Sequence, residues 1–284
     1  MIDPKNGNLA FKIFPVENDS PFDHTQRHNY YTMVLLSEGG GKLRSDFSDY
    51  HFEAPALLCF SPYQPFMIEP TGEVKGVVIN FHPDFFCIHQ HHKEVACNGV
   101  LFNNVYQAPF VEMSPTELEA LLELVEQLKT GMQTAGLAQY ELLISYLKIF
   151  LITASRMRIA QSDGDSNESR AKEPFILEGL KNAIENNFRS KHSAGDYADM
   201  LNMSPKTLAK IARSHFNKTL TNLIAERIII EAKRELYLTS KPVKAIAYEL
   251  GFNDEFYFSR FFKNNADVSP QLFRDTVGFA RAEA

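Results

Sequence analysis

Residues 247–263 read AYELGFNDEFYFSRFFK, and a related pattern, ADMLNMSPKTLAKIAR, stands at residues 198–213. In each copy an alanine precedes a leucine by three residues, a short break follows, and apolar residues then recur at helical spacing. Alanine at this place lets two short helices cross closely around a tight turn. The alanines, Ala198 and Ala247, lie 49 residues apart (247 minus 198). The chain is therefore predicted to contain two helix-turn-helix units.

The residues at each break suit a sharp helix end followed by a new helix start. Gly251 can take the left-handed conformation that such an end requires, and Asn253 or Asp254 can cap the next helix. Asn202 and Ser204 fit the same places in the first copy. A single copy would also suit an ordinary helical hairpin in a protein core. Two copies favour the paired helix-turn-helix.

Apolar residues between the copies predict one long helix from about Thr219 to Leu238. They recur at helical spacing at Leu220, Leu223, Ile224, Ile228, Ala232 and Leu236. A stiff helix would fix the distance between the two units. Recognition helices held on one face of a duplex enter successive major grooves, about 34 Å apart. We therefore expect the chain to bind DNA at two places at once.

An extended motif is formed by residues 247–263 together with Val268-Ser269-Pro270 and Phe273-Arg274. It resembles the C-terminal signature of the AraC/XylS family of transcription regulators, and the match runs from about Phe175 to Arg274. The resemblance implies sequence-specific binding to double-stranded DNA, contact with RNA polymerase and, commonly, activation. Four places depart from the family pattern. Phe256 replaces a small polar residue, Asn217 and Ala266-Asp267 replace glycines, and Ala212 replaces a phenylalanine.

The recognition helices carry the predicted DNA contacts. Lysine and arginine can donate to guanine, glutamate can accept from cytosine, and a phenylalanine ring can pack on a thymine methyl group. The predicted base contacts are Lys206, Ala209, Lys210, Glu255, Phe256 and Arg260. The predicted phosphate contacts, which position the protein without specifying sequence, are Ser204, Arg213, Lys218, Asn253 and Lys263. The alternative for each is a solvated helix side chain.

Charge divides unevenly along the 284 residues. Residues 170–284 carry 18 Lys and Arg against 14 Asp and Glu, and residues 1–169 carry 11 against 21. We expect the basic half, residues 170–284, to contact the DNA phosphates. The three cysteines, Cys59, Cys87 and Cys97, form no paired framework and are interpreted as reduced core thiols. With neither a leader-like N-terminus nor a membrane-length apolar run, we expect a cytoplasmic protein with no membrane partner.

The predicted fold class is a two-domain α+β arrangement. Residues 1–113 form a cupin-like sensor barrel, 114–160 a helical dimerisation segment, 161–173 a polar flexible linker, and 174–284 the DNA-binding domain. The dimerisation segment begins at a capping box, Ser114-Pro115-x-Glu117. A second helix, from about 138 to 159, carries an apolar stripe that suits either the domain core or a homodimer interface. By the family resemblance we expect dimerisation through Leu142, Tyr146, Leu147 and Phe150.

Short runs rich in aromatic and β-branched residues predict six strands within residues 30–81. They are residues 30–36, 42–47, 50–53, 56–60, 66–69 and 74–81, and Gly39-Gly40-Gly41 predicts a hairpin turn between the first two. The pattern resembles the cupin-like sensor domain of many AraC/XylS regulators. Its interior is the candidate pocket for a small-molecule effector. The predicted lining residues are Tyr30, Arg44, His51, Phe60 and Tyr63, and an inward Arg44 would favour an anionic ligand.

A barrel of this type also invites a metal or enzyme hypothesis. A metal cupin needs histidines two apart on one strand, with a carboxylate and a further histidine nearby. His51 lacks such neighbours, and the cluster His89-Gln90-His91-His92 is interpreted as a polar loop, so no metal, cofactor or catalytic residue is expected. Two alternatives stay open. One is a cupin-type enzyme or ligand-binding module whose helical half mediates protein contacts, and the other is a sensor governed by a protein partner.

Overall fold

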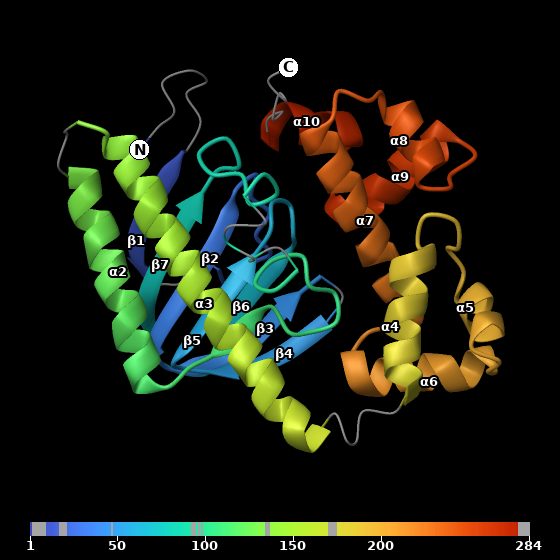
Figure 1. The fold of residues 1–284 in the computed structure, drawn as a ribbon, viewed down its shortest axis with the longest axis horizontal. Coiled ribbons are helices and arrows are strands. Elements are labelled where there is room, and N and C mark those ends of the chain that lie inside the picture. Colours follow the sequence, from blue (N-terminus) through green and yellow to red (C-terminus); the bar gives the residue numbers. More distant parts are fainter. Residues whose placement is uncertain are drawn as a thin grey trace. The chain divides into compact units, whose positions relative to one another are not determined.

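The structure of the protein is a computed structural model (Figure 1). It describes residues 1, 10–16, 22–46, 48–91, 95, 97, 99–133, 137–169 and 175–277, with the backbone alone for 162–169 and 175. The chain forms two compact units. The first comprises Met1–Ser45, Tyr50–Asn104 and Pro109–Gly164, and the second Asp46–Asp49, Val105–Ala108 and Asp165–Ala284. The predicted two-domain α+β fold is confirmed.

The first unit is built on two antiparallel sheets. One sheet has the strand order β1-β7-β2-β5-β8 and the other β4-β3-β6. The strands are β1 (Phe11–Val16), β2 (Tyr31–Glu38), β3 (Gly40–Ser45), β4 (Ser48–Glu53), β5 (Ala56–Phe60), β6 (Phe66–Pro70), β7 (Lys75–Phe81) and β8 (Phe110–Glu112). Among the described strands the two sheets stay separate, so the cupin-like barrel is not closed.

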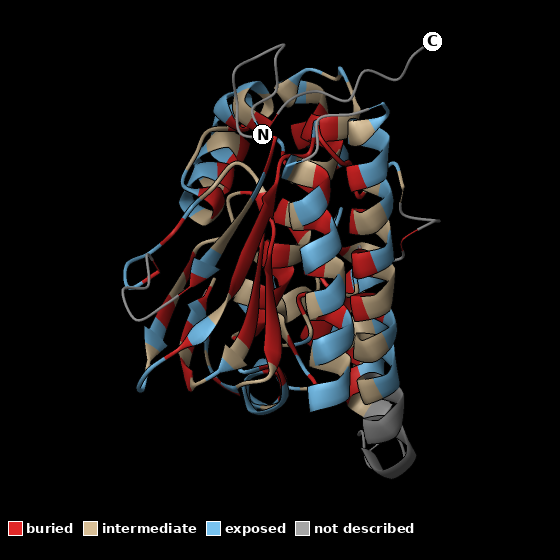
Figure 2. Cartoon of the chain, turned by 90° about the vertical axis from the view of Figure 1, so that its left-hand side faces the viewer, coloured by how far each residue is buried: buried red, intermediate tan, exposed pale blue. Residues whose placement is uncertain are grey.

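Alternation along the strands sends side chains into two cores. Val34 and Leu36 of β2 pack with Phe66 and Ile68 of β6 between the two sheets. Met33, next to Val34, joins the opposite core, which the helices α2 (Pro115–Gln133) and α3 (Gln139–Ser169) cover. Figure 2 shows these two helices with buried residues on one side and exposed residues on the other.

The helical hairpin begins as predicted. The Ser114 hydroxyl oxygen accepts from the Glu117 backbone amide at 3.3 Å, and the Ser114 amide donates to the Glu117 carboxylate at 2.8 Å. The predicted linker is wrong at its start, because α3 continues to Ser169 rather than ending near residue 160. Extending a helix that is already nucleated is easier than starting one, so its polar continuation stays helical. The rest of the predicted linker, 170–173, lies outside the described residues.

The predicted hairpin at Gly39-Gly40-Gly41 is also wrong. Strands β2 and β3, which flank it, belong to different sheets, so the chain turns a corner there. Gly39 has a φ of +91°, and a Cβ atom on it would lie 2.3 Å from the Glu73 carbonyl oxygen. Because glycine has no side chain, the backbone at Gly39 can lie close to that of Glu73. Gly39 does not form a two-residue hairpin turn.

Seven helices make up the described second unit: α4 (Phe175–Asn187), α5 (Ala194–Met200), α6 (Pro205–Phe216), α7 (Leu220–Leu238), α8 (Val243–Glu249), α9 (Glu255–Ala266) and α10 (Pro270–Val277). The long helix α7 matches the prediction and contacts α4, α6, α8, α9 and α10. Thr219 caps its start by accepting from the Asn222 amide. Leu223, Ile228 and Leu236 are buried along it. Both helix pairs, α5–α6 and α8–α9, are thus packed against α7 through at least one of their helices.

Candidate DNA interface

The first helix-turn-helix consists of α5 and α6. Ser193 caps α5 in a capping box with Asp196, and its hydrogen bonds hold the pKa of the Asp196 carboxyl below the usual value. The turn passes through Asn202, which has a left-handed φ of +52°. Ser204 then caps α6 by accepting from the Thr207 amide. The local chemistry predicted for Asn202 and Ser204 is confirmed.

The second helix-turn-helix, α8 and α9, repeats this geometry. Gly251 has a left-handed φ of +79°, and Asp254, rather than Asn253, caps α9 through the Tyr257 amide. The Phe252 amide donates to the Ala247 carbonyl oxygen at 2.9 Å, as the Met203 amide does to Ala198 at 2.9 Å in the first helix-turn-helix. The two turns thus share one hydrogen-bonding scheme, although the second is one residue longer.

Both recognition helices end in a left-handed residue where the family pattern has glycine. Asn217 follows α6 with a φ of +55°, and Asp267 follows α9 with a φ of +60°. Asparagine and aspartate tolerate this conformation better than other side chains do. These two departures from the family pattern therefore keep the backbone geometry.

The recognition helices present matching exposed faces. Lys206, Ala209 and Lys210 are exposed on α6, and Phe256 and Arg260 are exposed on α9. Phe256 is 74% exposed, an unusual state for a phenylalanine in a folded domain. The remaining predicted base contact, Glu255, is half-buried in the first turn of α9. Their contact with bases stays a prediction.

Four of the five predicted phosphate contacts, Ser204, Arg213, Asn253 and Lys263, are exposed as well. Lys218 is a correction. It is 4% exposed, and its ammonium group pairs with the Glu226 carboxylate of α7 at 2.7 Å. Burial raises the pKa of Glu226 to about 8, against the opposing effect of the Lys218 ammonium group. A lysine held in this way joins the end of α6 to α7 and does not face a phosphate.

Two exposed residues on the same faces were missed. Thr207 and Tyr257 occupy matching places, one residue after Lys206 and Phe256, and Tyr257 is 56% exposed. The signal was available in the sequence, because Thr207 and Tyr257 stand three residues before Lys210 and Arg260, and residues three apart on a helix lie on one face. Tyr257 follows Phe256 in the sequence, so two exposed aromatic residues mark the start of the second recognition helix.

Comparison with known proteins agrees with this geometry. A family described as a helix-turn-helix domain matches residues 197–276. An HTH-type transcriptional regulator of Pseudoalteromonas carrageenovora is 32% identical over 120 residues, which are 41% of this chain and 71% of the relative. The chain belongs to the AraC/XylS family of transcription regulators. It is a DNA-binding regulator of that family.

Two further proteins are similar to this AraC/XylS protein. The transcriptional activator RhaS of Mannheimia succiniciproducens is 32% identical over 91 residues, 32% of this chain, and the match spans only 34% of RhaS. The crystal structure of an apo ToxT variant from Vibrio cholerae is 16% identical, covers 95% of this chain and 99% of ToxT, and has a TM-score of 0.41.

The structure does not bring the five predicted pocket residues together. Arg44 and His51 are exposed on outward-facing positions of β3 and β4, so their assignment to the interior is wrong. Phe60 is buried and stacks on Phe66 with ring centroids 3.8 Å apart. Tyr30 and Tyr63 are half-buried and lie beside strands, not within them.

Two inward polar residues of the first unit were missed. Thr32 of β2 and Asn80 of β7 are paired across the strands and face the core between the sheets, as Val34 and Val78 do. Both are buried, and neither the Thr32 hydroxyl oxygen nor the Asn80 carboxamide oxygen has a hydrogen-bond partner in the described part of the chain. A buried oxygen without a partner is costly, so this pair marks a place for a polar group.

The described residues contain neither a metal-binding cluster nor a helix suited to crossing a membrane. No three His, Cys, Asp or Glu side chains there are arranged to hold a metal ion, although His92 of the predicted cluster lies outside them. Within the same ranges, no helix combines the length and the apolar character that crossing a membrane requires. Cys59, Cys87 and Cys97 are buried and form no disulfide with one another, and burial raises the pKa of the Cys97 thiol to about 12.

The predicted dimerisation residues divide between two environments. Leu147 and Phe150 are fully buried in the core between α2, α3 and the sheet, so the prediction is wrong for them. Tyr146 packs at the margin of that core. Leu142, by contrast, is 45% exposed, and Ile149, seven residues later on the same side of α3, is 47% exposed.

Proposed function

We propose that this regulator binds an operator of two half-sites in successive major grooves, with α6 in one groove and α9 in the next. The observation that carries the proposal is the matching exposed face of the two helices, with Lys210 on α6 and Arg260 on α9 at corresponding positions. Both are cations that can donate to guanine O6 and N7. Phe256 is suited to a thymine methyl group beside them. No step of the proposal needs catalysis.

An uncharged effector bound between the two sheets is the second part of the proposal. The buried polar side chains of the described residues in the first unit's sheets and loops are neutral hydrogen-bonding groups or histidine: Gln26, Thr32, Ser45, Ser61, Asn80 and His82. Arg44, the cation that would have favoured an anion, faces outward. Thr32 and Asn80 are the proposed contacts. A ligand that donates to Asn80 should raise the melting temperature of the wild type and leave that of Asn80→Leu unchanged.

Self-association through α3 is the third part of the proposal. Leu142 and Ile149 leave an apolar strip on the exposed side of the helix, and a second copy of the chain would cover it. Ile149→Lys should then shift the sedimenting species from dimer to monomer. Leu137→Lys is the matched control, because Leu137 is fully exposed before the start of α3. Equal sedimentation of the two variants and the wild type would refute this interface.

Activation of transcription through RNA polymerase completes the proposal, and it rests on the relative named as the activator RhaS.

A salt titration of duplex binding tests the DNA-binding core of the proposal. Each phosphate contact releases counterions, so the logarithm of the affinity should fall steeply with the logarithm of salt concentration. Lys210→Ala should weaken binding, whereas Lys129→Ala, on α2 of the first unit, should not. Binding that ignores both salt and Lys210 would favour a module for protein contacts instead.

A further inference from the structure

The loop of residues 188–192, between α4 and α5, is fixed to the first helix-turn-helix. The Lys191 amide donates to the Asn187 carbonyl oxygen at 2.9 Å. From α5, the fully buried Tyr197 donates its hydroxyl to the Lys191 carbonyl oxygen at 2.9 Å. Because these bonds hold the loop to α4 and α5, the loop moves with the first helix-turn-helix.

This loop also touches the second helix-turn-helix. A Cβ atom on Gly251 would lie 2.3 Å from the Arg189 carbonyl oxygen, so only a glycine lets the two backbones approach this closely. The His192 ring packs on the Phe252 ring with centroids 4.7 Å apart. Phe252 in turn packs on Phe258 of the recognition helix α9, at 5.1 Å. Contact therefore runs from the first helix-turn-helix to α9 without passing through α7.

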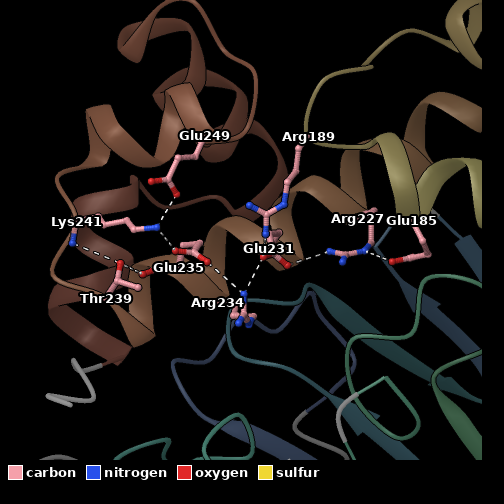
Figure 3. Close-up of polar contacts among 9 residues, drawn as sticks. All are labelled: Glu185, Arg189, Arg227, Glu231, Arg234, Glu235, Thr239, Lys241 and Glu249. Atoms are coloured by element: carbon pink, nitrogen blue, oxygen red, sulfur yellow. Dashed lines mark hydrogen bonds and ion pairs between the residues drawn. The ribbon is translucent and has the colours of Figure 1, made fainter. Parts of the chain in front are cut away.

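Ion pairs tie the same loop and α4 to the middle of α7 (Figure 3). The Arg189 guanidinium donates to Glu231 at 2.5 Å, and Arg227 donates to Glu185 of α4 at 2.8 Å and to Glu231 at 3.4 Å. Glu231 is buried, so its carboxylate depends on these partners. Farther along, Lys241 pairs with Glu235 of α7 at 3.1 Å and with Glu249 of α8 at 2.6 Å.

The geometry gives the two helix-turn-helix units a second connection besides α7. Each unit packs on α7, and the loop adds a contact between the units that lies away from this helix. Such a contact restricts the rotation of one unit relative to the other. Preorganised binding elements lose less freedom on association, and two linked sites bind together only when their geometry matches the target.

We infer that Arg189, His192, Glu231, Gly251 and Phe252, here called the inter-unit bridge, fix the angle and separation of α6 and α9 and so set the half-site spacing that the protein accepts. These residues would be positioning residues, because they act through the recognition helices. The inference rests on the proposed function, since both helices must read DNA for spacing to matter.

The test measures binding of the full-length protein to duplexes whose half-sites are moved apart or together one base pair at a time. Wild-type affinity should have a sharp optimum, near one helical turn of about 10 base pairs. In the double variant Arg189→Gln/His192→Ala the optimum should flatten, with about a tenfold loss at the preferred spacing. Affinity for a single half-site should stay unchanged.

The matched control is Arg234→Gln. Arg234 also pairs with Glu231, at 2.8 Å, but both residues lie on α7, so this change leaves the inter-unit bridge in place. Arg234→Gln should keep the wild-type dependence of affinity on spacing. If the double variant keeps it too, the inference is wrong. Equal losses on single and paired half-sites would also overturn the inference, since they indicate a folding role alone. If the double variant fails to fold, His192→Ala alone, which removes the ring that packs on Phe252, repeats the test. A wild type that selects no DNA would instead overturn the proposed function.

Discussion

Replacing Gly251 by asparagine isolates the close approach between the second helix-turn-helix and the loop of residues 188–192. Asparagine tolerates the left-handed conformation, with φ at +79°, so the backbone angle is not the main cost. The new Cβ atom, however, would lie 2.3 Å from the Arg189 carbonyl oxygen, whereas ordinary contact begins at 3.4 Å. The backbones must separate by about 1.1 Å, the difference between these distances. Forced overpacking of this kind costs about 1–3 kcal/mol.

Two further variants separate the sterics from the backbone angle. Gly251→Ala should be worse than Gly251→Asn, because alanine adds about 1–2 kcal/mol for the left-handed conformation. Asn202→Gly is the matched control at the equivalent turn position of the first helix-turn-helix, where φ is +52°. Glycine accepts that angle, so this change should stay within about 0.5 kcal/mol of the wild type.

Urea unfolding followed by the far-ultraviolet helical signal measures these free energies of unfolding. The midpoint should fall for both Gly251 variants while the slope with urea stays constant, since the surface exposed on unfolding is the same. A free energy of unfolding for Gly251→Asn within about 0.5 kcal/mol of the wild-type value would show that the loop of residues 188–192 and the second helix-turn-helix do not touch at this point.

Three more predictions address the DNA interface and its support. Arg260→Ala should weaken specific binding by about 1–3 kcal/mol and relax the preference at one or two base pairs; equal loss on specific and random duplexes would show that Arg260 contacts only the backbone. Arg213→Ala should reduce the salt slope of binding by about 1, measured by anisotropy, and an unchanged slope would remove Arg213 from the phosphate contacts. Burial lowers the pKa of His192 below its usual 6.5, so the unfolded state binds the proton more readily and stability is lost as the pH falls from 6.5 through the folded value. His192→Gln should flatten that part of the stability curve, and identical acid slopes for the two proteins would contradict the assignment.

The turns of the helix-turn-helix units could be predicted because their chemistry is local. Gly251, Asn202, Ser204 and Asp254 act on amides or backbone angles within three residues of themselves. Lys218 could not be placed in the same way. Lys218 lies between α6 and α7, and its burial depends on the pairing with Glu226 of α7. The position of a lysine in the sequence does not reveal such a partner.

The barrel was harder to predict for reasons of pairing and register. Strands β1 and β8 are the two edges of the larger sheet. The first contains Pro15, and the second has only three residues, so neither gives a strong strand pattern. Arg44 and His51 were assigned to the wrong face because the period of a strand is two, and the sequence does not say which set faces inward.

The apolar stripe of α3 shows a similar limit. Helical spacing identifies the residues that share a face, but it does not tell which of two apolar faces meets the sheet. Leu147 and Phe150 meet it, whereas Leu142 and Ile149 do not. Which face of α3 is buried depends on where the sheet packs against the helix, and the sequence of the helix does not show this.

Selection of bound sequences from a random duplex library by the full-length protein tests the central claim most directly. We predict enrichment of two different half-sites whose centres lie about 10–10.5 base pairs apart on one face of the duplex. Their sequences should differ because α6 presents Lys206 and Lys210 while α9 presents Phe256 and Arg260. A library without any enriched sequence, or with one half-site and no preferred neighbour, would contradict the claim that both units bind DNA together.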